Sequence, residues 1–135
     1  MSLPDALPPG LLIQPPMAPP ALDAAIASAR DKGWWVAHSG SLAGDNRLDL
    51  LRRLGTVLGC PQWYRPNWDA FSDCLHDLSW LQEAPRLLIV EVGRSPRNHG
   101  ERETEDWIET LVEILARACW YWADTTSPLT VVLTG

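Results

Sequence analysis

The chain has 135 residues and a net charge of −6, so it is long enough to bury the core of one domain of average size. It contains no run of 18 apolar residues, and its first twenty residues carry no Lys or Arg, so we expect neither a membrane span nor a secretory signal. Binding to nucleic acid requires a basic face, which we do not expect on a chain with this net negative charge. We therefore expect a cytoplasmic protein that binds neither nucleic acid nor a membrane.

The negative charge is unevenly distributed. Residues 61–83 have a net charge of −3 and residues 101–124 a net charge of −5, whereas residues 21–60 are slightly positive. Such asymmetry favours a basic partner, because opposite charges attract over the whole surface. Solubility alone also explains many acidic proteins, and both interpretations stay open at this point.

The N-terminal segment is rich in proline. Residues 1–20 contain seven of the twelve prolines, which block a regular helix and predict a flexible, extended tail. In residues 21–32, apolar side chains recur at helical spacing before Gly33, which predicts an additional helix that covers the domain. The domain itself is expected to span residues 21–135.

Strands and helices alternate along the rest of the chain. Apolar runs predict strands at 34–38, 86–92 and 129–134, and helical periodicity predicts a helix that ends at Gly59 and a long helix that ends near residue 122. Strands separated by helices pair in parallel, so we expect an α/β domain with a three-stranded parallel sheet. His38 has few acidic neighbours in the sequence, and we expect it to be structural.

Three cysteines, at positions 60, 74 and 119, are an odd and small number. Cys74 and Cys119 each fall on the apolar face of a predicted helix. This pattern favours reduced, buried thiols over a disulfide framework. The spacing matches no zinc motif, and we expect no metal and no cofactor.

The most informative stretch is residues 60–80. Asn67 is suited to cap a helix, because its amide oxygen can accept hydrogen bonds from the first helical turn. Asp69 lies in that turn, where a carboxylate is stabilised by the helix dipole. Prolines 61 and 66 keep the preceding segment out of a helix, so its aromatic residues, Trp63 and Tyr64, are predicted to lie on an extended loop.

The predicted helix at 68–78 has two distinct faces. Its apolar face is expected to consist of Trp68, Phe71, Cys74, Leu75 and Leu78, and its polar face of Asp69, Ser72, Asp73, His76 and Asp77. Like charges four residues apart repel by a few tenths of a kcal/mol, so folding gives no reason for two aspartates at this spacing. A partner would explain them. Helix capping for Asp69 and a solvated face for Asp73 are the alternatives.

The run Pro61-x-Trp63-Tyr64-x-x-Asn67-Trp68-Asp69-Ala70-Phe71-x-Asp73-Cys74-Leu75-x-Asp77-Leu78 resembles the signature of the barstar family, intracellular protein inhibitors of small secreted ribonucleases. The resemblance extends over residues 33–135. It implies a barstar-like α/β fold, a single layer of about three parallel strands packed with helices, to which the helix at 21–32 and the tail are additions.

The resemblance also implies which residues bind the partner. Asp73 matches the aspartate that enters the phosphate-binding centre of the enzyme, and Asp69 matches a second aspartate one turn earlier. Trp63 stands where the family has an interface tyrosine. The complete set of candidate partner-binding residues is Asp73, Asp69, Trp63, Asn67, His76, Asp77 and Tyr64.

The implied function is an antitoxin or immunity-type inhibitor. It would be monomeric when free and would block the active site of a small basic ribonuclease, or another basic enzyme, in a one-to-one complex. One alternative is an interaction module that binds a different basic partner without inhibiting a ribonuclease. Another is an enzyme with a carboxylate–histidine site on the same helix, although catalysis needs a concave site rather than a convex helix.

The chain departs from the family pattern at several positions. Arg65 stands where glycine is frequent, and Ser72 replaces a tryptophan of the best-known member. The resemblance leaves open which residue from the region of the last long helix reaches the interface, Tyr121 or Asp124.

Overall fold

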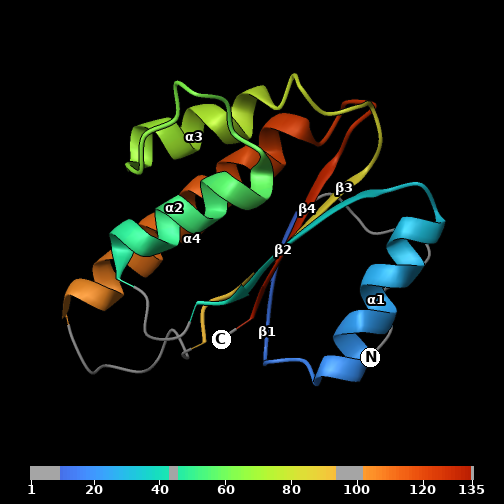
Figure 1. The fold of residues 1–135 in the computed structure, drawn as a ribbon, viewed down its shortest axis with the longest axis horizontal. Helices are drawn as coiled ribbons and strands as arrows, with labels where there is room; N and C mark the ends of the chain where they lie inside the picture. The colour runs from blue at the N-terminus through green and yellow to red at the C-terminus, as the bar shows by residue number, and fades with distance from the viewer. Residues whose placement is uncertain (1–9, 43–45, 94–101, 135) are drawn as a thin grey trace.

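The computed structural model describes residues 10–42, 46–93 and 102–134, and it shows a mixed α/β domain (Figure 1). The elements in chain order are β1 (Gly10–Gln14), α1 (Pro19–Asp31), β2 (Trp35–Ser41), α2 (Arg47–Leu58), α3 (Trp68–Asp77), β3 (Arg86–Glu91), α4 (Arg102–Trp122) and β4 (Leu129–Thr134). The strands form one parallel sheet in the order β1-β4-β3-β2. The predicted fold class is thus confirmed. None of the described helices is long and apolar enough to cross a bilayer.

The helices form a layer on each face of the sheet. The chain crosses the sheet in one direction from β1 to β2 and then returns through β3 to β4. Because connections between parallel strands are right-handed, this reversal places α1 on one face and α2, α3 and α4 on the other (Figure 1). In β3, Leu88 and Val90 face the three-helix side, and Leu87 and Ile89 face α1. The prediction that this strand is buried on both faces is confirmed.

The first strand corrects the prediction for the N-terminal segment. Residues 10–14, expected to be part of a flexible tail, form β1, which pairs with β4 along its full length. This stretch contains no proline, so its backbone can donate to a ladder. Leu11 packs on the three-helix side and Leu12 on the α1 side, as alternation in a strand requires. The sheet therefore has four strands rather than three. Residues 1–9 of the predicted tail lie outside the described residues.

The additional helix is confirmed, and it begins two residues earlier than predicted. α1 starts at Pro19, because proline is tolerated in the first helical turn, where its missing N–H has no partner in any case. Its buried residues are Leu22, Ala25 and Ala29. Leu22 and Ala29 pack against the side chains of β3 and β4 that face away from the other helices.

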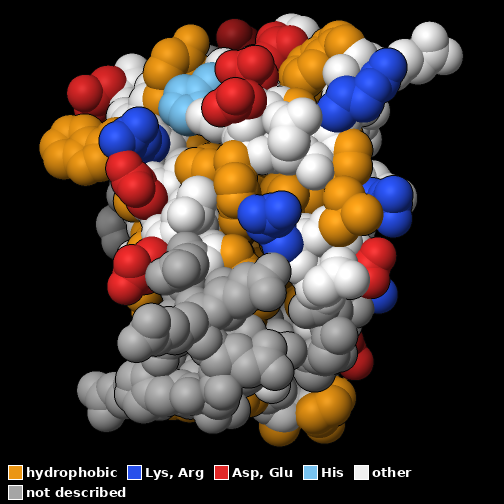
Figure 2. Space-filling model, turned by 90° about the vertical axis from the view of Figure 1, so that its left-hand side faces the viewer, with side chains coloured by type: hydrophobic (Ala, Val, Ile, Leu, Met, Phe, Trp, Pro, Cys, Tyr) orange, Lys and Arg blue, Asp and Glu red, His pale blue; other side chains and the backbone are white. Residues whose placement is uncertain are grey.

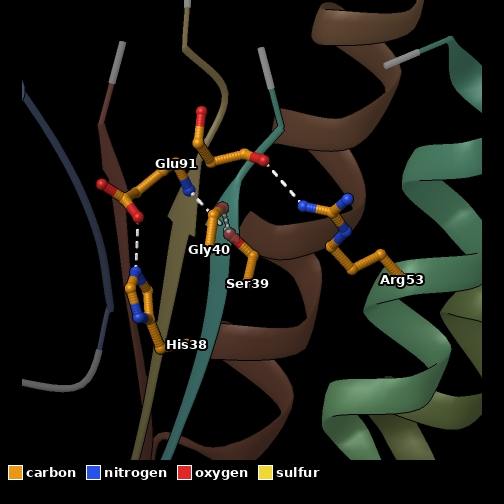
Figure 3. A network of polar contacts seen from close by, with 6 residues as sticks. His38, Ser39, Gly40, Arg53 and Glu91 are labelled. Carbon is orange, nitrogen blue, oxygen red and sulfur yellow. Dashed lines mark hydrogen bonds and ion pairs between the residues drawn. The ribbon is translucent and has the colours of Figure 1, made fainter. Parts of the chain in front are cut away.

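His38 has an acidic neighbour that the local sequence could not reveal. Its Nε2 lies 2.5 Å from a carboxylate oxygen of Glu91, on the adjacent strand and 53 residues away (Figure 3). The expected structural role of His38 is compatible with this pair, which the neighbouring sequence does not indicate. Parallel pairing of β2 with β3 brings the two residues together.

The end of β2 is held by polar contacts beside this pair (Figure 3). The strand register shifts after His38, and Gly40 there has a φ of +70°, which favours glycine. The Ser39 hydroxyl donates to the Gly40 carbonyl (2.6 Å) and accepts from the Glu91 amide (3.0 Å). Arg53 of α2 donates to the carbonyl of the last residue of β2 (2.7 Å), so these contacts attach α2 to the sheet edge.

Arg86, the first residue of β3, is a buried cation. Its guanidinium lies over the ring of Trp122 at 4.9 Å and donates to the Gln82 carbonyl (3.3 Å). Its Nε and Nη1 have no hydrogen-bond partner in the described part of the chain. Burial lowers the pKa of Arg86, against the opposite effect of the nearby Glu83 carboxylate. The contact with Trp122 ties the start of β3 to the end of α4.

Candidate functional site

The helix α3 begins where the sequence predicts and ends at Asp77, one residue before the predicted end. The Asn67 side chain accepts a hydrogen bond from the Ala70 amide (2.8 Å), so the predicted cap is confirmed. At the other end, Leu78 adopts a left-handed conformation with a φ of +49°. This conformation is uncommon for a residue other than glycine, and the complete burial of the Leu78 side chain compensates for it.

The apolar face of α3 is its attachment to the domain. Phe71, Cys74, Leu75 and Leu78 are fully buried, and they pack in the core formed with α2, α4 and the sheet. Trp68 is half-buried and lies edge-on to Phe71, with ring centroids 6.4 Å apart. A helix held by this many buried side chains cannot rotate about its axis, which fixes the direction of the opposite face.

The opposite face presents three carboxylates to solvent. Asp69, Asp73 and Asp77 are exposed, and none of them forms an ion pair with another described residue. Figure 2 shows acidic side chains gathered around a histidine at the end of the molecule that carries α3, with hydrophobic side chains beside them. These three aspartates, which we call the acidic face, are therefore available to a partner.

His76 connects the acidic face to α4. Its Nδ1–H donates to the carbonyl of Ser72 (2.7 Å), and its ring lies edge-on to Tyr121, with centroids 5.0 Å apart. Tyr121 in turn lies edge-on to Trp122 (5.1 Å), whose indole N–H donates to the Leu75 carbonyl (2.7 Å). The end of α4 is thus bonded to the end of α3.

The two candidates from the last long helix differ in their contacts with α3, and which of them reaches an interface stays a prediction. Tyr121 contacts a residue of α3 and is 57 % exposed, so an aromatic ring borders the acidic face. Asp124 is exposed in the turn after α4 and makes no described contact with α3. The packing of α4 on α3 places Tyr121, rather than Asp124, beside His76.

The loop before α3 turns its two aromatic residues in different directions. Trp63 is 45 % exposed, as a residue that binds a partner must be. Tyr64 points inward, where its hydroxyl donates to the Leu51 carbonyl of α2 (2.6 Å). Burial raises the pKa of Tyr64 to about 12. Tyr64 therefore holds the loop against α2, and its contact with a partner stays a prediction.

Arg65 introduces no strain into this loop. Its guanidinium donates to the carbonyls of Gln62 and Tyr64, both at 3.0 Å, and so folds back on its own segment. Among the described residues other than glycine, only Leu78 has a positive φ, so position 65 does not need the backbone freedom of glycine. The loop therefore accepts arginine at a position where the family pattern often has glycine.

Gly55 of α2 allows Tyr64 to pack closely. A Cβ at this position would lie 2.4 Å from Cε2 and 2.8 Å from Cδ2 of the Tyr64 ring. We expect Gly55→Ala to lower the free energy of unfolding by about 1–3 kcal/mol, as overpacking does. In a Tyr64→Ala background the same change should stabilise the protein by up to ~1 kcal/mol, because alanine is the better helix former. Urea denaturation of the four proteins tests this, and equal effects in both backgrounds would contradict the contact.

The cysteine prediction was partly wrong. Cys60 and Cys74 form a disulfide, with their Cα atoms 6.2 Å apart. The chain reverses at Gly59, which has a φ of +70°, and this turn brings Cys60 back over the buried side of α3. A spacing of 14 residues says nothing about that distance. Cys119 is a free, buried thiol as predicted, and burial raises its pKa to about 11 despite the opposing effect of a hydrogen bond with the Val131 backbone.

The described residues contain no group of three His, Cys, Asp or Glu side chains that could hold a metal ion. The aspartates and the histidine of α3 therefore do not form a metal site with one another. They lie on the outer side of a helix rather than around a cavity.

Comparison with known families shows the family of the chain. The model of the barstar family, described as barstar (barnase inhibitor), matches residues 43–134. No curated protein matches the chain. The family match covers more than half of the sequence and includes the whole of α2, α3, β3, α4 and β4. The chain, with its capped acidic helix and parallel sheet, therefore belongs to the barstar family.

Proposed function

We propose that this protein inhibits a small basic ribonuclease by covering the active-site groove of the enzyme with α3 and the Trp63 loop. The observation that carries the proposal is the acidic face, whose exposed carboxylates have no partner among the described residues, on a helix that is buried on its other side. Membership of an inhibitor family supports it, and we infer that the protein is not an enzyme.

The chemistry of the acidic face fits a ribonuclease groove. A site that holds RNA is lined by cations, because it must bind phosphates. Carboxylates on a rigid helix can occupy the phosphate positions, and their charge accelerates the encounter with a basic enzyme. The N-cap, the buried side of α3 and the disulfide all fix the helix before binding, so little conformational entropy is lost when the complex forms.

We assign different roles to the candidate residues. Asp73 and Asp69 bind the cationic side chains with which the enzyme holds phosphates. Asp77 and His76 make further contacts at the end of the same face. Trp63 and Tyr121 supply flat aromatic surface next to it. Asn67 and Tyr64 act by positioning, since the first is occupied as the helix cap and the second is bonded to α2.

The test is an inhibition titration against a panel of small basic ribonucleases. Activity should fall in proportion to the added protein and vanish at one equivalent, and light scattering should show a one-to-one complex. The association rate constant should fall about tenfold or more as added salt shortens the Debye length from ~30 Å to ~3 Å. Such a protein would serve as an antitoxin for the cell that makes the enzyme.

A protein that bound a basic partner stoichiometrically and left its ribonuclease activity unchanged would be an interaction module instead. This second candidate shares the acidic face and the salt dependence, so the activity measurement separates the two. If no basic protein binds, both assignments are wrong.

A further inference from the structure

We propose that the Cys60–Cys74 disulfide is a redox switch for partner binding, closed by oxidation and opened by a dithiol reductant. The inference rests on the proposed function, since it concerns the same surface. It adds a regulatory input that the acidic face alone does not have.

The position of the disulfide carries the proposal. It closes a covalent ring formed by residues 60–74, and this ring contains Trp63, Asn67, Asp69 and Asp73. One end, Cys60, lies just after α2, and the other, Cys74, lies on the buried side of α3 next to Asp73. The bond therefore links the Trp63 loop, residues 60–67, to the helix that bears the acidic face.

Besides the disulfide, the loop is held by the packing of Tyr64 against α2, by the two hydrogen bonds of the Arg65 guanidinium and by a small number of backbone bonds. Within it, the Tyr64 amide donates to the Pro61 carbonyl (3.0 Å) and the Asn67 amide to the Arg65 carbonyl (2.7 Å), and both bonds are local. The described hydrogen bonds to α2 are those of the Tyr64 hydroxyl and of the Cys60 amide, which donates to Gly55. α3 itself remains attached through its core residues when the disulfide opens. Reduction is thus expected to loosen the loop and leave the helix in place.

One end of the bond lies at an open hollow. Cys60 is half-buried and lines an open hollow of about 410 Å³ together with Arg52, Thr56 and Tyr64. A cation beside this hollow favours the approach of a thiolate. Cys74, the other end of the bond, is fully buried, so we place the attack at the Cys60 sulfur.

The exchange is a balanced two-electron reduction. A thiolate of the dithiol attacks the Cys60 sulfur, the S–S bond breaks, and Cys74 leaves as a thiolate that takes up a proton. The second thiol of the reductant then attacks the mixed disulfide, which releases Cys60 as a thiol and leaves the reductant as a cyclic disulfide. Oxidised dithiol of the same class drives the reverse reaction.

The expected consequence is a change in affinity. In the oxidised protein the Trp63 loop is already ordered, whereas in the reduced protein binding must order it. We expect the Kd for the inhibited ribonuclease to rise about tenfold on reduction, mainly through faster dissociation.

The experiment compares oxidised protein, protein reduced with dithiothreitol, and the variants Cys60→Ala and Cys119→Ala. Thiol titration of the denatured chain should count one thiol before reduction and three after it. Binding kinetics should show that Cys60→Ala matches the reduced wild type and no longer responds to dithiothreitol. Cys119→Ala, the matched control, should keep the full response.

Amide hydrogen exchange gives a readout that needs no partner. Exchange of the Tyr64 and Asn67 amides, which are hydrogen-bonded within the loop, should accelerate on reduction, while exchange in α1, on the other face of the sheet, should not change. Three thiols before reduction, equal Kd values in both states, or unchanged exchange in the loop would each overturn the switch. If the oxidised protein binds no ribonuclease, the proposed function fails, and accelerated loop exchange then still supports the redox-controlled loop.

Discussion

Asp73→Ala is expected to weaken binding of the ribonuclease by about 2–5 kcal/mol, or ~30- to ~4,000-fold in Kd, because it leaves a cation of the enzyme buried without its partner. This range is the general one for truncating a buried charge pair, a class in which barnase and barstar are themselves a measured example. The stability of the free protein should change by less than ~0.5 kcal/mol, because Asp73 is exposed and has no partner among the described residues. Stopped-flow association and dissociation rates, together with urea denaturation, measure both quantities.

Asp23→Ala is the matched control for this variant. Asp23 is an exposed aspartate of α1, on the opposite face of the sheet, so its removal changes the net charge equally. We expect it to lower the association rate slightly and to leave dissociation unchanged. If the two variants bind with the same affinity, only the total charge matters, and α3 is not the interface.

Phe71→Ala is expected to lower the free energy of unfolding by about 3–5 kcal/mol, the usual cost of removing a buried aromatic side chain. Phe71 is fully buried, and it packs against the core and Trp68. Since domains of this size are stabilised by about 5–15 kcal/mol in total, the variant should unfold at a much lower concentration of urea. Partner binding should weaken as well, because the helix loses the contacts that hold it in place.

Asp77→Ala, an exposed change on the same helix, is the control for this loss of stability. It should unfold at nearly the wild-type concentration of urea. A Phe71→Ala protein with unchanged stability would show that α3 is not seated through this ring. Taken together, Asp73→Ala and Phe71→Ala test whether the exposed side of α3 determines binding while its buried side determines stability.

The sequence alone determined the features of this protein that depend on neighbouring residues. Local hydrogen bonding predicts the cap at Asn67. Helical periodicity predicts that Phe71 and Leu75 are buried and that Asp69 and Asp73 are exposed. The parallel α/β fold followed from the alternation of strands and helices, because short connections leave few topologies. The family signature lies within this local pattern, which explains why the acidic face was found without a structure.

Only the tertiary structure decided which distant residues meet. The pairing of β1 with β4 joins segments at opposite ends of the chain, and the short apolar run at residues 10–14 among prolines does not indicate a strand by itself. The Cys60–Cys74 bond and the inward direction of Tyr64 both depend on how the loop returns over α2 and α3. The contact of Tyr121 with His76 depends on the packing of two helices. Periodicity predicts which face of an element is buried. Which other element packs against that face is determined by contacts between residues that are far apart in the sequence.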